Sequence, residues 1–327
     1  MMKELARPGL NQPLRVRAVP PPPVRPAFLS HPRLRRTSPI AQYAVAAALE
    51  ALGKDAEMVA DKSLPLGIVY CAMTGCVKYS LRFYEEALRD PMTASPLIFP
   101  ETVYNAPASH LSALLGTTGI NYTLVGDAGT FLQGLALAAD WLLAGRVVGC
   151  LVIGAEELDW LVAEASSFFD RDGTVSEGSG ALYLTCESTQ TPAVELHAIS
   201  EPQMFTRGQC RVEAATRTLG QLNNTGLGSP LYDSSQGELG WPTREEAAWS
   251  GWKGRRISPK KVCGEAFMAS AAWQCVAAVD ALARGACPTA TVGIIGANEQ
   301  AIAAEFVAAL LPKTRMTGSI TDQTWAY

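Results

Sequence analysis

The sequence predicts an α/β protein in which helices alternate with strands that are covered on both faces. Two kinds of segment indicate this: short apolar runs such as 66–71 (LGIVYC) and 147–153 (VVGCLVI), and Ala-rich helical runs such as 40–52 and 131–143. A strand without polar residues is typical of a sheet that is covered by helices on both sides. Gly53, directly after the first helical run, is a common helix terminator.

The segments between these runs continue the alternation. The residue pattern predicts helices at 81–89 and 106–115, separated by a proline-bounded loop at 91–100. A short strand at 122–125 follows and leads into the Ala-rich helix at 131–143.

An internal echo predicts two similar halves. Gly126, Asp127 and Ala128 open an Ala-rich helix, which is followed by a strand ending in Val-Ile-Gly-Ala-Glu. Residues 264–266 (Gly-Glu-Ala) open a second such helix, followed by a strand ending in Ile-Ile-Gly-Ala-Asn. Chance similarity between two Ala-rich helices is the alternative, and we favour a duplicated α/β half with a boundary near 187–193. Ala128 and Glu265 would then lie at equivalent helix N-termini, where the backbone stabilises a thiolate or an oxyanion.

Composition limits the class of protein. With 327 residues, of which 48% are hydrophobic and 18% charged, the chain can form a sizeable core and is not disordered in composition. The longest apolar run, at 147–155, has nine residues, too few to span a membrane. Eight cysteines without a secretory signal predict reduced core thiols and a cytoplasmic protein. The three histidines are dispersed and no phosphate-binding glycine loop is present, so we expect no metal and no cofactor.

The first 40 residues differ from the rest of the chain. They contain eight Lys or Arg, one acidic residue and nine of the 21 prolines. This composition predicts a solvated, partly extended basic arm over residues 1–37. The alternative is an electrostatic docking site for an acidic protein partner. Nucleic acid is a poorer fit, because the arm lacks interleaved aromatic residues and the remaining chain is acidic.

Three stretches carry a resemblance to a known family. They are 119–157, with Gly119 before a strand, Gly145 after a helix and Gly-Ala-Glu at 154–156; the block 177–181 (EGSGA), preceded by Phe169, Asp170, Asp172 and Gly173; and 97–111 (LIFPETVYNAPASHL). They resemble the corresponding segments of β-ketoacyl synthases, and 119–157 aligns with the nucleophile segment without a gap. The resemblance extends over residues 31–300.

The resemblance implies a thiolase-like fold, in which two duplicated α/β halves form an α-β-α-β-α layered arrangement. The halves would span 38–187 and 188–327. Such proteins resemble one another in being dimers, which places 121–125, the strand before the nucleophile, at the subunit interface. The implied partners are an acyl carrier protein or acyl-CoA thioesters, and no nucleic acid.

The catalytic residues of the resembled family are not found at the matching positions. The family uses a cysteine at a helix N-terminus to take the acyl chain and two histidines to stabilise the developing negative charge. The alignment places Ala128 at the cysteine, Thr225 at the first histidine and Glu265 at the second, whereas Lys260 is retained. Ala128 cannot carry an acyl group, and an ionised Glu265 would repel an enolate.

These losses predict a non-condensing protein similar to a chain-length factor, which pairs with a Cys-containing ketosynthase in fatty acid, polyene or polyketide synthesis. The pair is a heterodimer, or else the chain forms a homodimer. The alternative is a divergent enzyme on acyl thioesters, a hydrolase, decarboxylase or acyltransferase, that uses Glu265, Asp127 or Cys263.

Several other residues are candidates for the site or its support. Asp127 is expected to cap the helix that follows it, and the alternative is that it acts as a base. Cys263 lies close to Glu265 in sequence, and Asn298 lies in a 293–298 loop that resembles the family's final glycine-rich loop without its phenylalanine. Glu177 and Asp233 are expected to be structural. Cys71 and Cys76 have a spacing that could hold a metal or a disulfide, but without a second pair we interpret them as core thiols.

Overall fold

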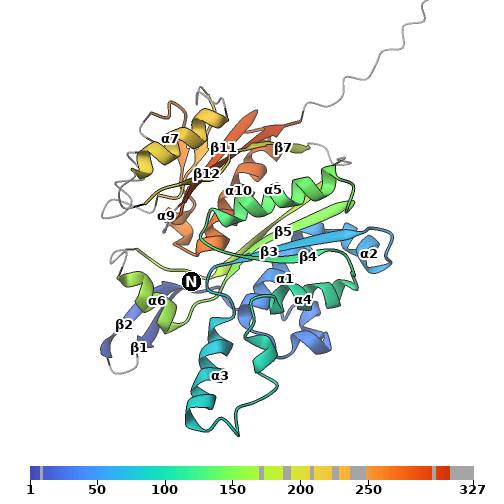
Figure 1. The fold of residues 1–327 in the computed structure, drawn as a ribbon, viewed down its shortest axis with the longest axis vertical. Coiled ribbons are helices and arrows are strands. Elements are labelled where there is room, and N and C mark those ends of the chain that lie inside the picture. Colours follow the sequence, from blue (N-terminus) through green and yellow to red (C-terminus); the bar gives the residue numbers. More distant parts are fainter. Residues whose placement is uncertain are drawn as a thin grey trace, which may run out of the picture.

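The structure is a computed structural model that describes residues 1–7, 10–168, 173–186, 193–206, 210–222, 228–235, 248–249, 251–296 and 300–309. It contains two mixed β-sheets, with two long helices between them and further helices on the outer faces (Figure 1). No helix in these ranges is both long enough and apolar enough to cross a membrane.

The first sheet has the strand order β4-β3-β5-β6. Strand β3 (Leu66–Ala72) pairs in parallel with β4 (Asn121–Val125) and β5 (Gly149–Glu156), and β6 (Gly178–Thr185) pairs antiparallel with β5. Every residue of β3 and β5 is buried, as their continuous apolar sequence predicts. Strand β5 ends at Glu156, where the internal repeat predicts its end, and its pairing with β6 continues to that residue.

The second sheet has the strand order β10-β9-β11-β12-β7, and β8 also pairs with β12. Its strands are β7 (Val194–Ile199), β8 (Gln203–Met204), β9 (Leu231–Tyr232), β10 (Arg256–Ile257), β11 (Thr289–Ile295) and β12 (Gln300–Ala308). Strands β10, β9 and β11 are parallel and β12 is antiparallel to β11. The directions therefore repeat those of β4-β3-β5-β6, which confirms the predicted duplication.

Two helices form the layer between the sheets. Helix α5 (Thr130–Leu143) packs on β3 and β5 and also contacts β12. Helix α10 (Phe267–Ala283) packs on β5 and β6 of the first sheet and on β11 and β12 of the second. Both helices contribute to one central apolar core, which includes Phe131, Leu135 and Cys275.

Alternate residues of β3 separate this central core from an outer one. Val69 and Cys71 belong to the central core, whereas Ile68 and Tyr70 belong to the outer core. The outer face is covered by α1 (Pro39–Leu52) and α4 (Ala106–Leu115), with the short α2 (Asp55–Ala60) beside them. Helix α7 (Arg211–Gln221) packs on β11 and β12 of the second sheet. The α-β-α-β-α layered arrangement is thus confirmed.

The N-terminal segment begins as a β-hairpin. Strands β1 (Met2–Arg7) and β2 (Leu10–Arg17) pair antiparallel and pack on α6 (Trp160–Ser167). Residues 20–25 are exposed, and two short 3-10 helices, η1 (Ala27–Ser30) and η2 (Pro32–Leu34), lead to α1. The expected boundary near 187 lies outside the described residues.

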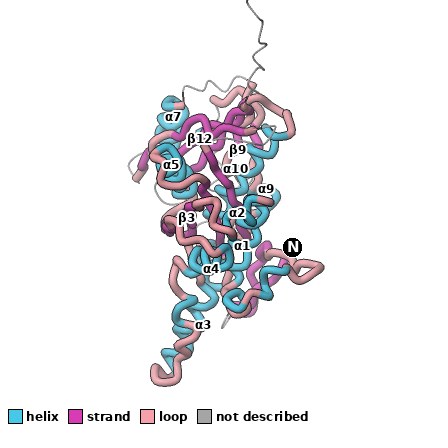
Figure 2. Tube along the Cα trace, turned by 90° about the vertical axis from the view of Figure 1, so that its right-hand side faces the viewer, coloured by secondary structure: helices cyan, strands magenta, loops and turns pink. Residues whose placement is uncertain are grey.

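One helical segment projects from the body of the protein. Helix α3 (Val77–Arg89) starts four residues before its predicted position, and none of its residues is buried. The chain returns through a loop and the short helix η3 (Phe99–Glu101), and the rings of Phe83 and Phe99 lie 5.3 Å apart. We call residues 77–104 the α3 arm. It extends away from the two sheets in both views (Figure 1, Figure 2).

Candidate functional site

The site lies where the two central helices begin. Ala128 is 6% exposed and directly precedes the first turn of α5. Gly154 of β5 lies between Phe131 of α5 and the backbone of Met268 in α10, and a Cβ on Gly154 would overlap the Met268 carbonyl oxygen. The first turns of α5 and α10 are therefore neighbours.

Asp127 ties the start of α5 to the second half of the protein. Its Oδ1 accepts hydrogen bonds from the Gly129 backbone N–H at 3.0 Å and from Gln300 Nε2 at 2.5 Å. Gln300 lies at the start of β12 and also donates to Thr130 Oγ1 at 3.4 Å. Gly296 faces the same carboxylate so closely that a Cβ would overlap it. Asp127 thus binds the backbone just before α5. Its second partner, Gln300, is a residue that sequence analysis did not identify.

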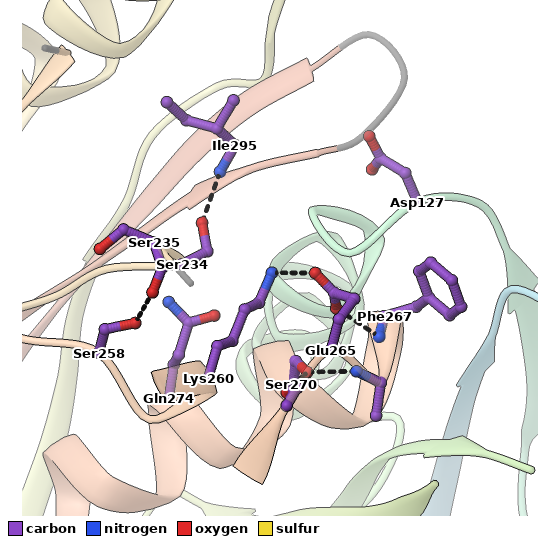
Figure 3. A network of polar contacts seen from close by, with 12 residues as sticks. Asp127, Ser234, Ser235, Ser258, Lys260, Glu265, Phe267, Ser270, Gln274 and Ile295 are labelled. Carbon is purple, nitrogen blue, oxygen red and sulfur yellow. Dashed lines mark hydrogen bonds and ion pairs between the residues drawn. The ribbon is translucent and has the colours of Figure 1, made fainter. Parts of the chain in front are cut away.

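Glu265 forms a tight ion pair with Lys260. Lys260 lies on the short helix α9 (Lys260–Cys263), its side chain is 4% exposed, and its Nζ lies 2.6 Å from Glu265 Oε2. The other carboxylate oxygen accepts the Phe267 backbone N–H at 2.7 Å (Figure 3). The buried ammonium of Lys260 therefore compensates the negative charge of Glu265.

The backbone around Glu265 is also fixed. The Glu265 N–H donates to the Thr174 carbonyl at 2.8 Å, and the Ser176 N–H donates to the Glu265 carbonyl at 2.7 Å. Gly264 has a φ of 87° and approaches Thr174 so closely that a Cβ would not fit. The N-terminal hairpin joins this arrangement, because the Arg17 N–H donates to the Val175 carbonyl at 2.9 Å.

The end of β9 contributes further polar groups. Ser234 Oγ accepts the Ile295 N–H at 3.3 Å, so Ser234 lies beside the β11 end that leads to Gly296 and Asp127. Figure 3 shows Ser234, Lys260, Glu265 and Asp127 in the same region. Sequence analysis did not identify Ser234, and no residue pattern around it distinguishes it from other loop serines.

Asp233 is buried and its carboxylate is bound by several side chains. It is 1% exposed, and its carboxylate accepts bonds from the Arg256 guanidinium at 2.8 Å and from Ser235 Oγ at 2.6 Å. The hydroxyl of Ser258 donates in turn to the Ser235 carbonyl. These bonds connect the loop after β9 with β10.

Gln274 contacts the backbone of two strands of the second sheet. It belongs to α10, is fully buried, and donates from Nε2 to the Tyr232 and Gly293 carbonyls, both at 3.3 Å. It therefore links α10 to the paired strands β9 and β11.

Two adjacent carboxylates at the end of β5, Glu156 and Glu157, are buried. Glu156, the last residue of β5, accepts the Met73 N–H at 2.6 Å and the Thr74 N–H at 3.0 Å, yet burial raises the pKa of its carboxyl to about 7. Glu157 accepts bonds from Ser38 Oγ and from the Ile40 and Lys78 N–H groups, and burial likewise raises its pKa.

Glu177 has contacts from several segments. It forms a 3.2 Å ion pair with Lys78 and accepts bonds from Tyr43 Oη and from the Leu158 and Val19 N–H groups. These partners come from the segment after the hairpin, α1, α3 and the segment after β5. The carboxylate of Glu177 therefore links four segments of the chain.

The cysteines do not supply a nucleophile at the helix start. Cys71, Cys76, Cys150 and Cys275 are buried, and burial raises the pKa of each thiol. Cys263 is exposed at the end of α9. Thr225 and Asn298 lie outside the described residues, and no cluster of metal ligands is present within the described ranges.

Comparison with known proteins defines the fold class. A scan against protein-family models and a search of curated proteins find no match. Among solved structures, the chain is similar to a β-ketoacyl synthase from Burkholderia phymatum STM815, with a TM-score of 0.73, 16% identity, and coverage of 90% of this chain and 88% of that one. It is also similar to the ishigamide ketosynthase/chain length factor (TM-score 0.75, 18% identity, coverage 93% and 90%).

A third similar structure is AntDE:AntF, described as a type II PKS acyl-carrier protein in complex with its ketosynthase bound to the hexaketide. Here the TM-score is 0.75, the identity 17%, and the coverage 90% of this chain and 89% of that one. The protein therefore has the β-ketoacyl synthase fold, and the predicted thiolase-like fold is confirmed. The same fold is present in structures that contain a chain length factor.

Proposed function

We propose that the protein is a non-condensing, chain-length-factor-like partner of a Cys-containing ketosynthase in fatty acid, polyene or polyketide synthesis. The observation that carries this proposal is Ala128 at the start of α5. A helix start in a buried site activates a thiolate, but a methyl group has no atom that can accept an acyl chain.

The state of Glu265 supports the same conclusion. An active ketosynthase needs a group here that donates to a developing oxyanion, and the removal of one such donor costs about 10²–10³ in rate. Both oxygens of Glu265 are occupied, by Lys260 and by the Phe267 N–H. The site therefore lacks both a covalent group at Ala128 and a donor at Glu265.

The framework around these positions is intact, which fits a role in shaping a partner's site. Three buried carboxylates, at Glu156, Glu157 and Glu177, join the segments on which the site is built. We expect strand β4, at 121–125, to lie at the subunit interface, as the family resemblance implies.

The N-terminal segment supports a carrier protein as a further partner. Arg25, Arg33, Arg35 and Arg36 are exposed, and no ion pair of these four is found in the described part of the chain. Exposed cations without an ion-pair partner favour an acidic protein surface. Eight free thiols fit a reducing compartment, and we propose a cytoplasmic location.

Mass spectrometry of the intact protein tests the proposal. The chain is incubated with acyl-carrier-protein and acyl-CoA thioesters, with a Cys-containing ketosynthase as the positive control. We expect no adduct and no loss of thioester. An adduct, or thioester turnover that Glu265→Gln abolishes, would instead favour a divergent acyl-thioester enzyme, and peptide mapping would identify its nucleophile.

A further inference from the structure

The hairpin carries a partly buried cation that has no counter-charge. Arg17 is the last residue of β2, on the hairpin that lies beside α6 (Figure 1). Its Nε is buried and makes no hydrogen bond. Within the described residues, the guanidinium also forms no ion pair. A buried donor on a charged group without a partner is rare in proteins and indicates a missing ligand, ion or water.

Ser176, beside Arg17, is in the same state. It is 2% exposed, and its Oγ has no hydrogen-bond partner. Arg17 and Ser176 are partners in a parallel β-bridge, so their side chains lie on the same face of strands about 5 Å apart. Gly264 faces Ser176 without a side chain, and a Cβ there would lie 3.2 Å from the Ser176 Oγ. We call this pair of unpartnered groups the Arg17–Ser176 site.

The carboxylates next to the Arg17–Ser176 site are bound by other groups. The Glu177 carboxylate is bound by Lys78 and by two backbone N–H groups. The Glu265 carboxylate lies 2.6 Å from Lys260. Neither carboxylate forms an ion pair with Arg17, so the charge of the guanidinium is not neutralised from within this part of the chain.

We propose that the Arg17–Ser176 site binds an oxyanion group, either a phosphate or a carboxylate. The guanidinium offers several N–H donors in a planar fork that matches the oxygens of both groups. The Ser176 hydroxyl donates to a further oxygen of the same group. The anion satisfies both unpartnered atoms and supplies the missing negative charge, whereas a metal cation is repelled by Arg17. Arg17 is only partly buried, so the group enters from the guanidinium side.

A bound anion would also stabilise the attachment of the hairpin. Three backbone segments already lie side by side here. The Arg17 N–H donates to the Val175 carbonyl at 2.9 Å, and the Ser176 N–H donates to the Glu265 carbonyl at 2.7 Å. An anion held by Arg17 and Ser176 joins the first two segments through side chains as well. Its binding therefore favours the docked hairpin and the adjacent backbone of Glu265.

Thermal unfolding in different sodium salts tests the proposal. Sodium chloride is replaced stepwise by sodium phosphate or by sodium acetate at constant pH and ionic strength. A ligand of the folded state raises the unfolding midpoint with its concentration. We expect such a rise for the natural chain in phosphate or acetate, and the two arms identify which oxyanion binds. Arg17→Met should raise the apparent dissociation constant at least about tenfold, and Ser176→Ala about three- to tenfold.

Lys3→Met is the matched control. Lys3 pairs with Val16, so it lies on the same hairpin but on the opposite face from Arg17. This variant loses the same charge and should keep the natural affinity. Hydrogen exchange locates the effect, because the anion should slow exchange of the backbone amides at 174–177.

Two results would overturn the proposal. One is a natural chain whose midpoint rises no more in phosphate or acetate than in chloride, which would show that the Arg17–Ser176 site holds only water. The other is an equal rise in the natural chain and in Arg17→Met, which would assign the effect to the salt and not to the site. The proposal does not rest on the proposed function. The experiment contains no thioester and no partner protein, so the two proposals fail separately.

Discussion

The burial of Glu156 makes the stability of the protein depend on pH. Its carboxyl is buried at the end of β5 and accepts backbone N–H groups from the loop that leads into α3. Burial raises its pKa from 4.5 to about 7, so the folded protein binds a proton more strongly than the unfolded chain does. The stability that this group contributes is complete below about pH 4.5 and is lost as pH rises through about 7.

We therefore predict that the free energy of unfolding falls between about pH 5 and pH 8, by roughly 3 kcal/mol from this group. Urea unfolding across this range measures the slope. Glu156→Gln should reduce the dependence of the unfolding free energy on pH, whether or not it also lowers that free energy. A smaller dependence of the same sign should remain, because the pKa of Glu157 is raised as well. Glu57→Gln, at an exposed position, should leave the slope unchanged. An equally steep slope in Glu156→Gln would contradict this assignment.

The Lys260–Glu265 pair permits a second test at the residue scale. Glu265→Gln leaves the buried ammonium of Lys260 without its counter-charge, and we expect a loss of about 1–3 kcal/mol in unfolding free energy. Lys260→Met/Glu265→Gln removes both charges and should recover most of that loss. Thermal and urea unfolding of the three proteins measure the coupling. Strictly additive effects in the double variant would show that the two groups do not stabilise one another.

Helix α10 packs closely on β5 because Gly154 has no side chain. A Cβ on Gly154 would overlap the Met268 carbonyl oxygen and contact the Phe131 ring. Gly154→Ala should therefore displace α10 and destabilise the protein by roughly 2–4 kcal/mol. Gly220→Ala is the matched control, because nothing lies within 4 Å of its Cβ position in α7 and alanine favours a helix. Urea unfolding should show a loss for the first variant and no loss for the second.

The elements also show which features could be predicted from sequence. Strands β3 and β5 are predictable because every residue is buried, and α5 because its Ala-rich sequence is long. Strands β9 and β10 have two residues each and exist through distant pairings, such as Leu231 with Arg256 and Thr291. The hairpin β1–β2 interrupts a proline-rich segment and is held by contact with α6, which no local pattern reveals.

The site is partly predictable for the same reason. The positions of Ala128 and Glu265 follow from a local sequence pattern at two helix starts. The contacts that engage the neighbouring groups do not, because Gln300 is 173 positions from its partner Asp127. Long-range side-chain partners of this kind require the three-dimensional arrangement.

On the scale of the whole molecule, charge is unevenly distributed. The body is acidic, whereas the segment before α1 exposes Arg25, Arg33, Arg35 and Arg36. We predict that Arg33→Glu/Arg35→Glu/Arg36→Glu weakens binding of an acidic carrier protein at least about tenfold and reduces its salt dependence. Isothermal titration calorimetry at two salt concentrations measures both. Arg284→Glu, on an exposed turn after α10, should retain the natural affinity; equal weakening by this control would indicate a general charge effect.

The central core has a consequence for how the chain reaches its native state. Helices α5 and α10 are separated by more than a hundred residues, yet they share one core with strands from both sheets. A fragment that ends after β6 would lack α10. The face of α5 that contacts the second sheet, and the surface of β5 and β6 that α10 covers, would then be exposed to water. The two halves repeat one topology, but because they share this core we expect that neither half folds as an independent unit. Because so many contacts join distant residues, we expect slow, concerted folding in which neither half is protected from hydrogen exchange before the other.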